Sequence, residues 1–343
     1  MPEHASRTEP GGELAAKVAY LSQPCAYPEK TSTVEARETH MSWVFLTDLH
    51  AYKLKKPVRY SFLDFTTIEA RRLNCEREVH LNRRLAPDVY LGVVALCVDA
   101  EGQLRLDGNG RVVDWLVKMR RLPPEQTLES AIAAGRVQEK AVRQLSEILT
   151  RFYQSAAPVP MEGREYRRRF ERDVGEIREE LGRPEFGLPR DLADRLATAL
   201  RGFLAGRGDL LEARAGRVVE CHGDLRPEHI YLGENPVVLD CLEFNREFRI
   251  LDPVDELAYL AMECDRLGAP FIEAWVFDCY VSRTADTAPR PVIDFYKCFR
   301  ACLRAKIAIW HLNEPDVRTP EKWRERALQY LTLAQDYSTR LGC

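Results

Sequence analysis

Hydrophobic and polar residues alternate along the first third of the chain and recur with a helical period in the remainder. Three alternating segments predict a three-stranded antiparallel meander at 33–40, 43–48 and 51–58. Apolar residues at roughly helical spacing predict one long helix over 66–86. Strand patterns return at 90–100, 102–108 and 112–119. We therefore expect a five- or six-stranded sheet that carries one helix.

Beyond Pro123 and Pro124 the alternation stops and helical periodicity takes over. One continuous apolar stripe predicts an amphipathic helix over 137–153, and two helices with exposed charged faces are expected within 163–215. Later helices are predicted at 252–267, 271–283, 294–312 and 321–341. With the two prolines as a hinge, the expected parts are an N-terminal extension (1–30), a β-rich lobe (31–122) and a helical lobe (123–343).

Charged residues make up 30% of the 343 positions but nearly cancel, which leaves a formal net charge of −3. This balance disfavours a nucleic-acid or anionic-membrane partner. The start of the chain shows no cationic stub before an apolar core, so no signal peptide is expected. The longest nearly apolar run, 90–100, is about half the length that a bilayer requires. Ten cysteines without a CxxC pair favour a reduced, cytoplasmic protein, whose oligomeric state the sequence leaves open.

The densest group of reactive side chains lies in residues 221–245, CHGDLRPEHIYLGENPVVLDCLEFN. His222, Asp224, His229 and Asp240 fall there at strand ends or in turns. Four potential proton carriers or metal ligands so close together exceed what a hairpin needs for its structure. By residue type alone, two imidazoles and two carboxylates also suit a zinc- or manganese-dependent metallohydrolase.

Several segments resemble the aminoglycoside phosphotransferases and the choline-kinase-like small-molecule kinases. HGDLRPEHI (222–230) resembles their H-x-D-x-x-x-x-N loop. VVLDCLEF (237–244) resembles their metal-binding aspartate strand, and DPVDELAYL (252–260) resembles the helix start that follows it. AYKLKKPV (51–58) and EREVHLNRRLAPDVYLGVV (76–94) resemble the strand with the nucleotide lysine and its partner helix. The resemblance covers roughly residues 35–310.

This resemblance implies an α+β, protein-kinase-like fold with a β-rich and a helical lobe. It also implies an ATP-dependent phosphotransferase that moves the γ-phosphate to a hydroxyl of a small molecule, together with Mg²⁺ or Mn²⁺. The acceptor would be an aminoglycoside, amino sugar, sugar or amino alcohol. Acidic residues such as Glu243, Glu263 and Asp265 would suit a cationic acceptor.

In such a site Asp224 would receive or orient the proton of the attacking hydroxyl, and His222 would hold the loop from a buried position. Asp240 ends an apolar strand, where a carboxylate is costly without a cation beside it. The resemblance makes that cation a metal ion on the nucleotide phosphates. Glu243 would assist the metal or be a solvent-exposed glutamate.

The nucleotide side of the site rests on the strand at 51–58. Ala51, Lys53 and Lys55 share one face of that strand, since side chains alternate. The resemblance implies that Ala51 leaves room for adenine and that Lys53 reaches the phosphates. The partner of this lysine would be Glu78, with Glu76 as the alternative on the same helix.

Two further positions would contact the nucleotide. The hinge at 118–122, including Met119, would offer backbone groups to adenine, and Ser42, in the turn before the second strand, would bond a phosphate. Asp252 is expected to cap the helix that begins at Pro253. Asp255, in the first turn of that helix, would favour its N-terminus and brace the catalytic loop backbone.

His229 departs from the family pattern, because it occupies the position of a metal-binding asparagine. Magnesium prefers hard oxygen ligands, whereas imidazole suits zinc, manganese or iron. One of the two metal sites could be lost, or manganese could replace magnesium. The chain could instead be a nucleotide-binding pseudokinase, an interaction module whose contact surface lies within 163–215.

Overall fold

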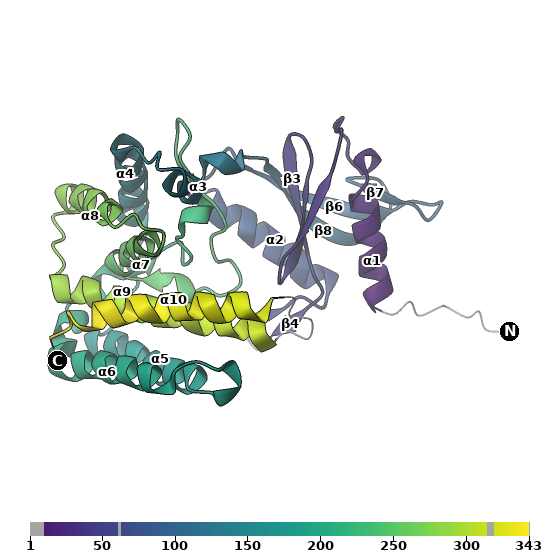
Figure 1. Ribbon diagram of the computed structural model, residues 1–343. Helices are drawn as coiled ribbons and strands as arrows, with labels where there is room; N and C mark the ends of the chain where they lie inside the picture. Colours follow the sequence, from purple (N-terminus) through teal and green to yellow (C-terminus); the bar gives the residue numbers. More distant parts are fainter. Residues whose placement is uncertain (1–9, 61–62, 314–318, 343) are drawn as a thin grey trace. The chain divides into compact units, whose positions relative to one another are not determined.

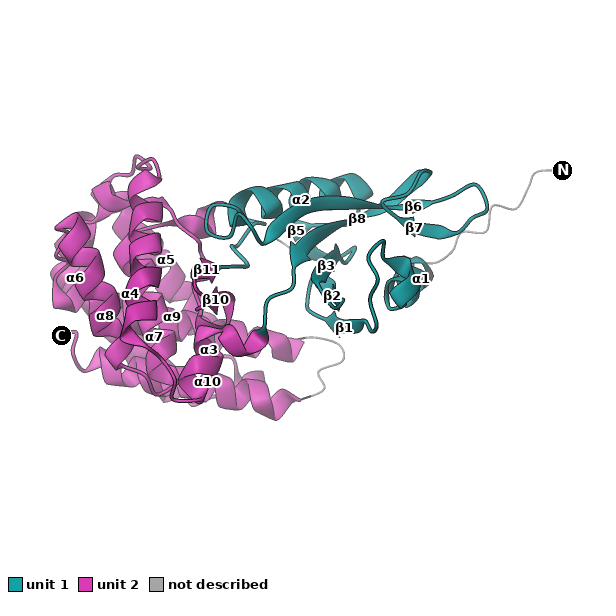
Figure 2. Ribbon diagram, turned by 90° about the horizontal axis from the view of Figure 1, so that it is seen from above, with its two compact units in different colours: residues 1–123, 238–245 teal, residues 124–237, 246–343 magenta. Residues whose placement is uncertain are grey.

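The protein is described by a computed structural model that covers residues 10–60, 63–313 and 319–342. The first nine positions of the expected N-terminal extension lie outside the described residues. The chain divides into two compact units (Figure 2). Residues 1–123 and 238–245 form the first unit, and residues 124–237 and 246–343 form the second.

The first unit is built on a six-stranded antiparallel sheet with the strand order β1-β2-β3-β8-β6-β7. Figure 1 shows this sheet with β3, β8, β6 and β7 labelled. Its strands are β1 (Glu35–Glu38), β2 (Ser42–Leu46), β3 (His50–Lys55), β6 (Tyr90–Val98), β7 (Leu104–Leu106) and β8 (Arg111–Arg120). A separate hairpin consists of β4 (Arg59–Tyr60) and β5 (Leu63–Asp64). The predicted meander and the three later strands are thus confirmed.

Helices α1 (Pro10–Leu21) and α2 (Ile68–Asn82) lie on opposite sides of this sheet (Figure 2). The α1 side holds an apolar core that includes Leu21, Tyr52 and Leu54. Because side chains alternate along β3, its residues Lys53 and Lys55 point to the α2 side. The sheet therefore separates an apolar core from a charged face.

Local capping sets where α2 begins. The predicted helix over 66–86 starts at Ile68, because the hydroxyl of Thr67 accepts a hydrogen bond from the backbone N–H of Ala70 at 3.1 Å. Buried Arg71 then donates to both carboxylate oxygens of Asp114 on β8, at 2.7 and 3.0 Å. This bidentate pair ties α2 to the sheet and so determines which helix residues face β3.

The second unit is mostly helical (Figure 1). Its helices are α3 (Leu128–Ala133), α4 (Glu139–Ser155), α5 (Gly163–Leu181), α6 (Arg190–Glu212), α7 (Pro253–Arg266), α8 (Phe271–Thr284), α9 (Arg290–Trp310) and α10 (Pro320–Ser338). All were predicted except α3, which is too short to show an apolar stripe. The short strands β9 (Val219–Glu220) and β12 (Ile250–Leu251) pair with each other. Strand β10 (Ile230–Tyr231) pairs with β11 (Val237–Val238), at whose second residue the chain passes into the first unit.

Helix α7 is buried along most of its length. It begins where expected, because the Asp252 carboxylate accepts from the N–H of Val254 at 3.0 Å and Pro253 occupies the first turn. Arg214 holds the same carboxylate through two hydrogen bonds of 2.7 Å. Among the described residues, no helix has the length and apolar character that a membrane crossing requires.

Candidate active site

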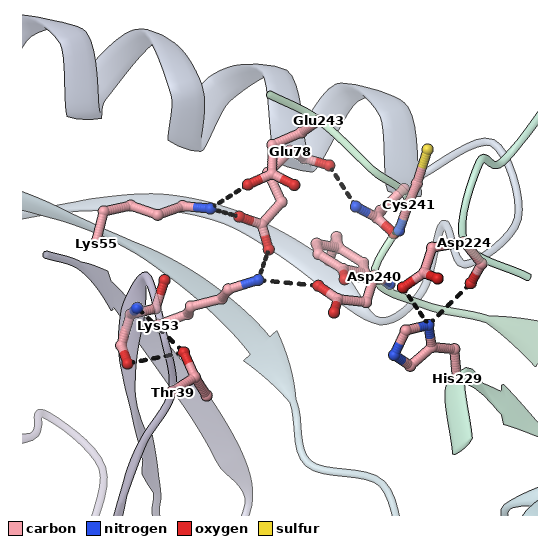
Figure 3. Close-up of polar contacts among 12 residues, drawn as sticks. Thr39, Lys53, Lys55, Glu78, Asp224, His229, Asp240, Cys241 and Glu243 are labelled. Carbon is pink, nitrogen blue, oxygen red and sulfur yellow. Dashed lines mark hydrogen bonds and ion pairs between the residues drawn. The ribbon is translucent and has the colours of Figure 1, made fainter. Parts of the chain in front are cut away.

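A charged cluster in the first unit centres on Lys53. Its ammonium group donates to Glu78 Oε1 and to Asp240 Oδ1, each at 2.9 Å (Figure 3). The structure thus brings Glu78, rather than Glu76, to the lysine. Glu76 instead pairs with Arg72 on the exposed side of α2. Three of the predicted site residues therefore meet in one place.

Lys55 belongs to the same cluster, although sequence reasoning assigned it no role. Its buried ammonium group donates to Glu78 Oε2 and, at 2.5 Å, to Glu243 Oε1. Glu243 is buried in this pair, so of its two predicted alternatives the solvent-exposed one is wrong. The signal for Lys55 was its position two residues after Lys53, on the same strand face.

Opposite charges outweigh burial throughout this cluster. Burial alone would raise the pKa of the Glu78 carboxyl, but Lys53 and Lys55 hold that pKa below its ordinary value. Burial would lower the pKa of the Lys53 amine, but Asp240 and Glu78 raise it well above its ordinary value. Both groups are therefore charged near neutral pH, as a phosphate-binding lysine requires.

Asp240 sits in a constrained backbone position. Its φ of 60° lies in the left-handed region, which costs a residue other than glycine about 1–3 kcal/mol. Its N–H donates to the hydroxyl of Tyr90 at 3.2 Å, and the next N–H, of Cys241, donates to Asn82 Oδ1 at 2.9 Å. These contacts hold the turn, while 48% of the Asp240 side chain stays exposed.

The Asp240 carboxylate suits a magnesium or manganese ion, because these ions prefer hard oxygen ligands. Magnesium is commonly held by one or two carboxylates together with substrate phosphates. Among the described residues no group of three or more His, Cys, Asp or Glu side chains could hold a metal by itself. Asp240 therefore fits an ion that arrives with the nucleotide rather than a metal caged by the protein.

The candidate adenine contacts also lie in the first unit. Ala51 and Met119 are cross-strand partners on β3 and β8, and both side chains are buried. Ser42 is the first residue of β2 rather than part of the preceding turn, and it too is buried. The turn is closed instead by Thr39, whose hydroxyl accepts from the N–H of Ser42 at 3.1 Å (Figure 3).

The second unit holds Asp224 in a network of its own. Its Oδ1 atom accepts from the hydroxyl of Tyr259 at 3.0 Å and lies 2.9 Å from Nε of Arg226. Buried His222 accepts from the backbone N–H of Asp224 through Nδ1 at 3.3 Å, which is the supporting role expected of it. Sequence reasoning missed Arg226 and Tyr259. Only the place of Arg226, two residues after Asp224, hinted at a role.

The brace under this loop is Glu256 and not Asp255. Glu256 accepts backbone N–H bonds from His222 at 3.2 Å and Gly223 at 2.6 Å. Burial raises the pKa of Glu256, and these donors partly offset that effect. Asp255 instead forms a buried bidentate pair with Arg300, at 2.7 and 2.6 Å. The neighbouring residue thus takes the role that the resemblance implied for Asp255.

His229 has both ring nitrogens engaged. Nδ1 lies 3.0 Å from the backbone oxygen of Asp224 (Figure 3), and Nε2 lies 3.1 Å from a guanidinium nitrogen of Arg226. A carbonyl can only accept and a guanidinium can only donate. The geometry therefore matches the tautomer with its proton on Nδ1 and its Nε2 lone pair directed at Arg226. A metal ion at this imidazole would have to displace Arg226.

The acidic residues expected to attract a cationic acceptor are already neutralised. Glu243 pairs with Lys55. Buried Glu263 accepts from the hydroxyl of Tyr330 at 2.8 Å and pairs with both Arg266 and Arg304. Asp265 binds Lys297 at 2.6 Å and the hydroxyl of Tyr337 at 2.5 Å. These three carboxylates therefore do not supply the unpaired negative charge that a cationic acceptor was expected to meet.

A sheet unit with a Lys–Glu–Asp cluster and a helical unit with a braced His-Gly-Asp loop define the class of protein-kinase-like phosphotransferases. The chain belongs to the phosphotransferase enzyme family, whose model matches residues 51–278. Two uncharacterised proteins, from Mycobacterium bovis and Mycobacterium tuberculosis, are each 36% identical to it over 282 residues. The matched region is 80% of this chain and 54% of theirs, so the chain spans about half the length of these curated relatives.

Solved structures show the same fold at low sequence identity. Choline kinase from Cryptosporidium parvum superposes with a TM-score of 0.58 and 10% identity, covering 96% of each chain. The GDP complex of aminoglycoside 2′-phosphotransferase-IIIa superposes with a TM-score of 0.55 and 14% identity. This match covers 97% of this chain and 99% of that one. A choline/ethanolamine kinase family protein from Mesorhizobium loti superposes with a TM-score of 0.52 and 16% identity. This match covers 96% of this chain and 100% of that one. The predicted α+β, protein-kinase-like fold is confirmed.

Proposed function

We propose that the protein transfers the γ-phosphate of ATP to a hydroxyl group of a small molecule. The observation that carries this proposal is the Lys53 ammonium group, held between Glu78 and Asp240 in the first unit. Phosphoryl transfer depends on positioning and charge neutralisation more than on covalent chemistry. A lysine oriented by one carboxylate beside a second, half-exposed carboxylate suits triphosphate binding.

Each group in the first unit then has one role. Lys53 binds phosphate oxygens, and Glu78 keeps its ammonium group pointed at them. Asp240 holds Mg²⁺ or Mn²⁺, which supplies neutralising charge when it is bound. Ala51 and Met119 border the adenine site. Membership of the phosphotransferase enzyme family supports this assignment.

Asp224 in the second unit acts as the general base for the acceptor hydroxyl. Tyr259 and Arg226 contact its Oδ1 atom and so orient the carboxylate. Glu256 and His222 hold the loop backbone on which Asp224 sits. This arrangement keeps the base in one orientation at little entropic cost when the acceptor binds.

The acceptor is an aminoglycoside, amino sugar, sugar or amino alcohol. Neither a nucleic acid nor a membrane is part of this proposal. A cytoplasmic site of action is supported by the nine described cysteines, all of which are free thiols.

A nucleotide-binding pseudokinase is the second candidate. It is favoured by the hydrogen bonds that occupy both nitrogens of His229, at the position of the family's metal-binding asparagine. The metallohydrolase alternative needs several ligands on one ion, and the described residues contain no such group.

ATP consumption with a panel of hydroxylated acceptors tests the proposal. The wild-type protein is assayed with Mg²⁺ and with Mn²⁺, and binding of a fluorescent ATP analogue is measured in parallel. Acceptor-dependent ADP formation is the expected result. Nucleotide binding without turnover on any acceptor would establish the pseudokinase, and bound zinc with hydrolysis but no nucleotide binding would establish a metallohydrolase.

A further inference from the structure

Lys55 is a second lysine on the same carboxylate as the candidate phosphate-binding lysine. Glu78 receives Lys53 on Oε1 and Lys55 on Oε2, so the two lysines hold its carboxyl group from two sides (Figure 3). The two lysines differ in exposure, because 15% of the Lys53 side chain is exposed but only 1% of that of Lys55. Lys55 is therefore too buried to bind a phosphate itself.

Lys55 also reaches the turn that carries Asp240. Its Nζ atom lies 2.5 Å from Oε1 of Glu243, three residues after Asp240. One ammonium group thereby joins α2, through Glu78, to the segment 240–243. Loss of Lys55 would remove a buried ammonium group from both carboxylates, Glu78 and Glu243.

The turn at 240–243 needs such support. Asp240 adopts a left-handed backbone conformation, which persists only when surrounding contacts hold it. At its start, the N–H of Asp240 donates to the hydroxyl of Tyr90 and the N–H of Cys241 donates to Asn82 Oδ1. The Lys55–Glu243 pair is a side-chain contact at its other end, and its loss would leave that end attached less firmly.

We propose that Lys55 is a positioning residue that orients Glu78 and clamps the Asp240 turn through Glu243. The importance of this clamp for nucleotide binding rests on the proposed function. The clamp itself is a property of the first unit and can be tested without nucleotide.

The test is hydrogen–deuterium exchange of the peptide that covers residues 238–245, in the full chain without ligand. Lys55→Met and Glu243→Gln should each speed exchange there about tenfold or more, since both break the same buried pair. Lys56→Met is the matched control, because that neighbouring lysine pairs with the exposed Glu38 and lies over the Trp43 ring. Glu243→Gln is nearly isosteric and keeps the test available if Lys55→Met fails to fold.

Nucleotide binding distinguishes positioning from simple stabilisation. Under conditions where Lys55→Met is folded, we expect its affinity for a fluorescent ATP analogue to fall about tenfold, with partial rescue in Lys55→Arg. The proposal would be overturned if residues 238–245 exchanged deuterium in Lys55→Met and Glu243→Gln as slowly as they do in Lys56→Met. It would also be overturned if folded Lys55→Met bound the ATP analogue with wild-type affinity. A wild-type protein that consumes no ATP with any acceptor would count against the proposed function alone, because the exchange result does not depend on turnover.

Discussion

The ammonium nitrogen of Lys53 lies 2.9 Å from Oδ1 of Asp240, although the two residues are 187 positions apart in the chain. This contact joins the candidate phosphate-binding residue to the candidate metal-binding residue. Both belong to the first unit, because residues 238–245 group with the sheet rather than with the helices.

Lys53→Met removes the ammonium group from this cluster and keeps a side chain of similar length. Lys55 still neutralises Glu78, so the fold should be retained. We expect ATP binding or turnover to fall at least about tenfold, which corresponds to the loss of one charge-assisted hydrogen bond. Lys56→Met serves as the control and should behave like the wild type. Equal losses in both variants would place the nucleotide site elsewhere.

Asp224→Asn keeps the shape of the side chain but removes its basicity. General-base catalysis contributes about 10²–10⁴-fold to a rate. Turnover on the best acceptor should therefore drop on that scale, while binding of a fluorescent ATP analogue stays close to wild type. Steady-state kinetics and a binding titration on the same preparation measure both. Near-normal turnover in this variant would remove Asp224 from the mechanism.

His229 contacts Arg226 and a backbone carbonyl, and this geometry predicts a positioning role rather than metal binding. His229→Asn cannot reach Arg226, so kcat should fall because the guanidinium beside Asp224 loses an acceptor. The ratio of activity with Mg²⁺ to activity with Mn²⁺ should stay unchanged. A shift of that ratio toward magnesium in the variant would instead identify the imidazole as a metal ligand.

Glu256 and its neighbour Asp255 provide a matched pair of substitutions. Glu256→Gln places an amide nitrogen against the backbone donors of His222 or Gly223, and should lower both turnover and stability, the latter by about 1–3 kcal/mol. Asp255→Asn breaks the buried pair with Arg300 and should cost about 3–5 kcal/mol of stability with a smaller change in kcat. The free energy of urea unfolding and kcat, measured for both variants, distinguish these two effects. A larger loss of kcat in Asp255→Asn than in Glu256→Gln would identify Asp255 as the residue that holds the loop backbone.

Glu78 predicts how the stability of the first unit depends on pH. Its folded-state pKa is lowered from the ordinary 4.5, so the folded protein binds fewer protons at this group than the unfolded chain does. The stabilisation is complete above pH 4.5 and is lost as pH falls through the depressed pKa. The wild type should therefore melt at a higher temperature than Glu78→Gln at pH 7, and the difference should shrink below pH 4.5. A difference that persists to the lowest pH would contradict the ion-pair account.

Local pattern was sufficient to predict most of the secondary structure and to single out residues 221–245 as the candidate reactive segment. Alternation along β3 and helical spacing in α4 reflect the geometry of a single element, which neighbouring residues determine. The HGD motif indicated Asp224 for the same reason, because its residues are neighbours in the sequence. The start of α7 at Asp252 was also local, because a capping residue acts within its own first turn.

The pairing between elements could not be predicted in this way. Glu76 and Glu78 lie about 200° apart around α2, and only the docking of that helix on the sheet decides which one meets Lys53. The contacts of Lys55 with Glu243 and of Glu256 with the loop backbone likewise join distant segments. The sequence by itself determined which elements form and which residue types carry the chemistry. Only the tertiary structure decided which charges neutralise one another, because that depends on contacts between residues far apart in the chain.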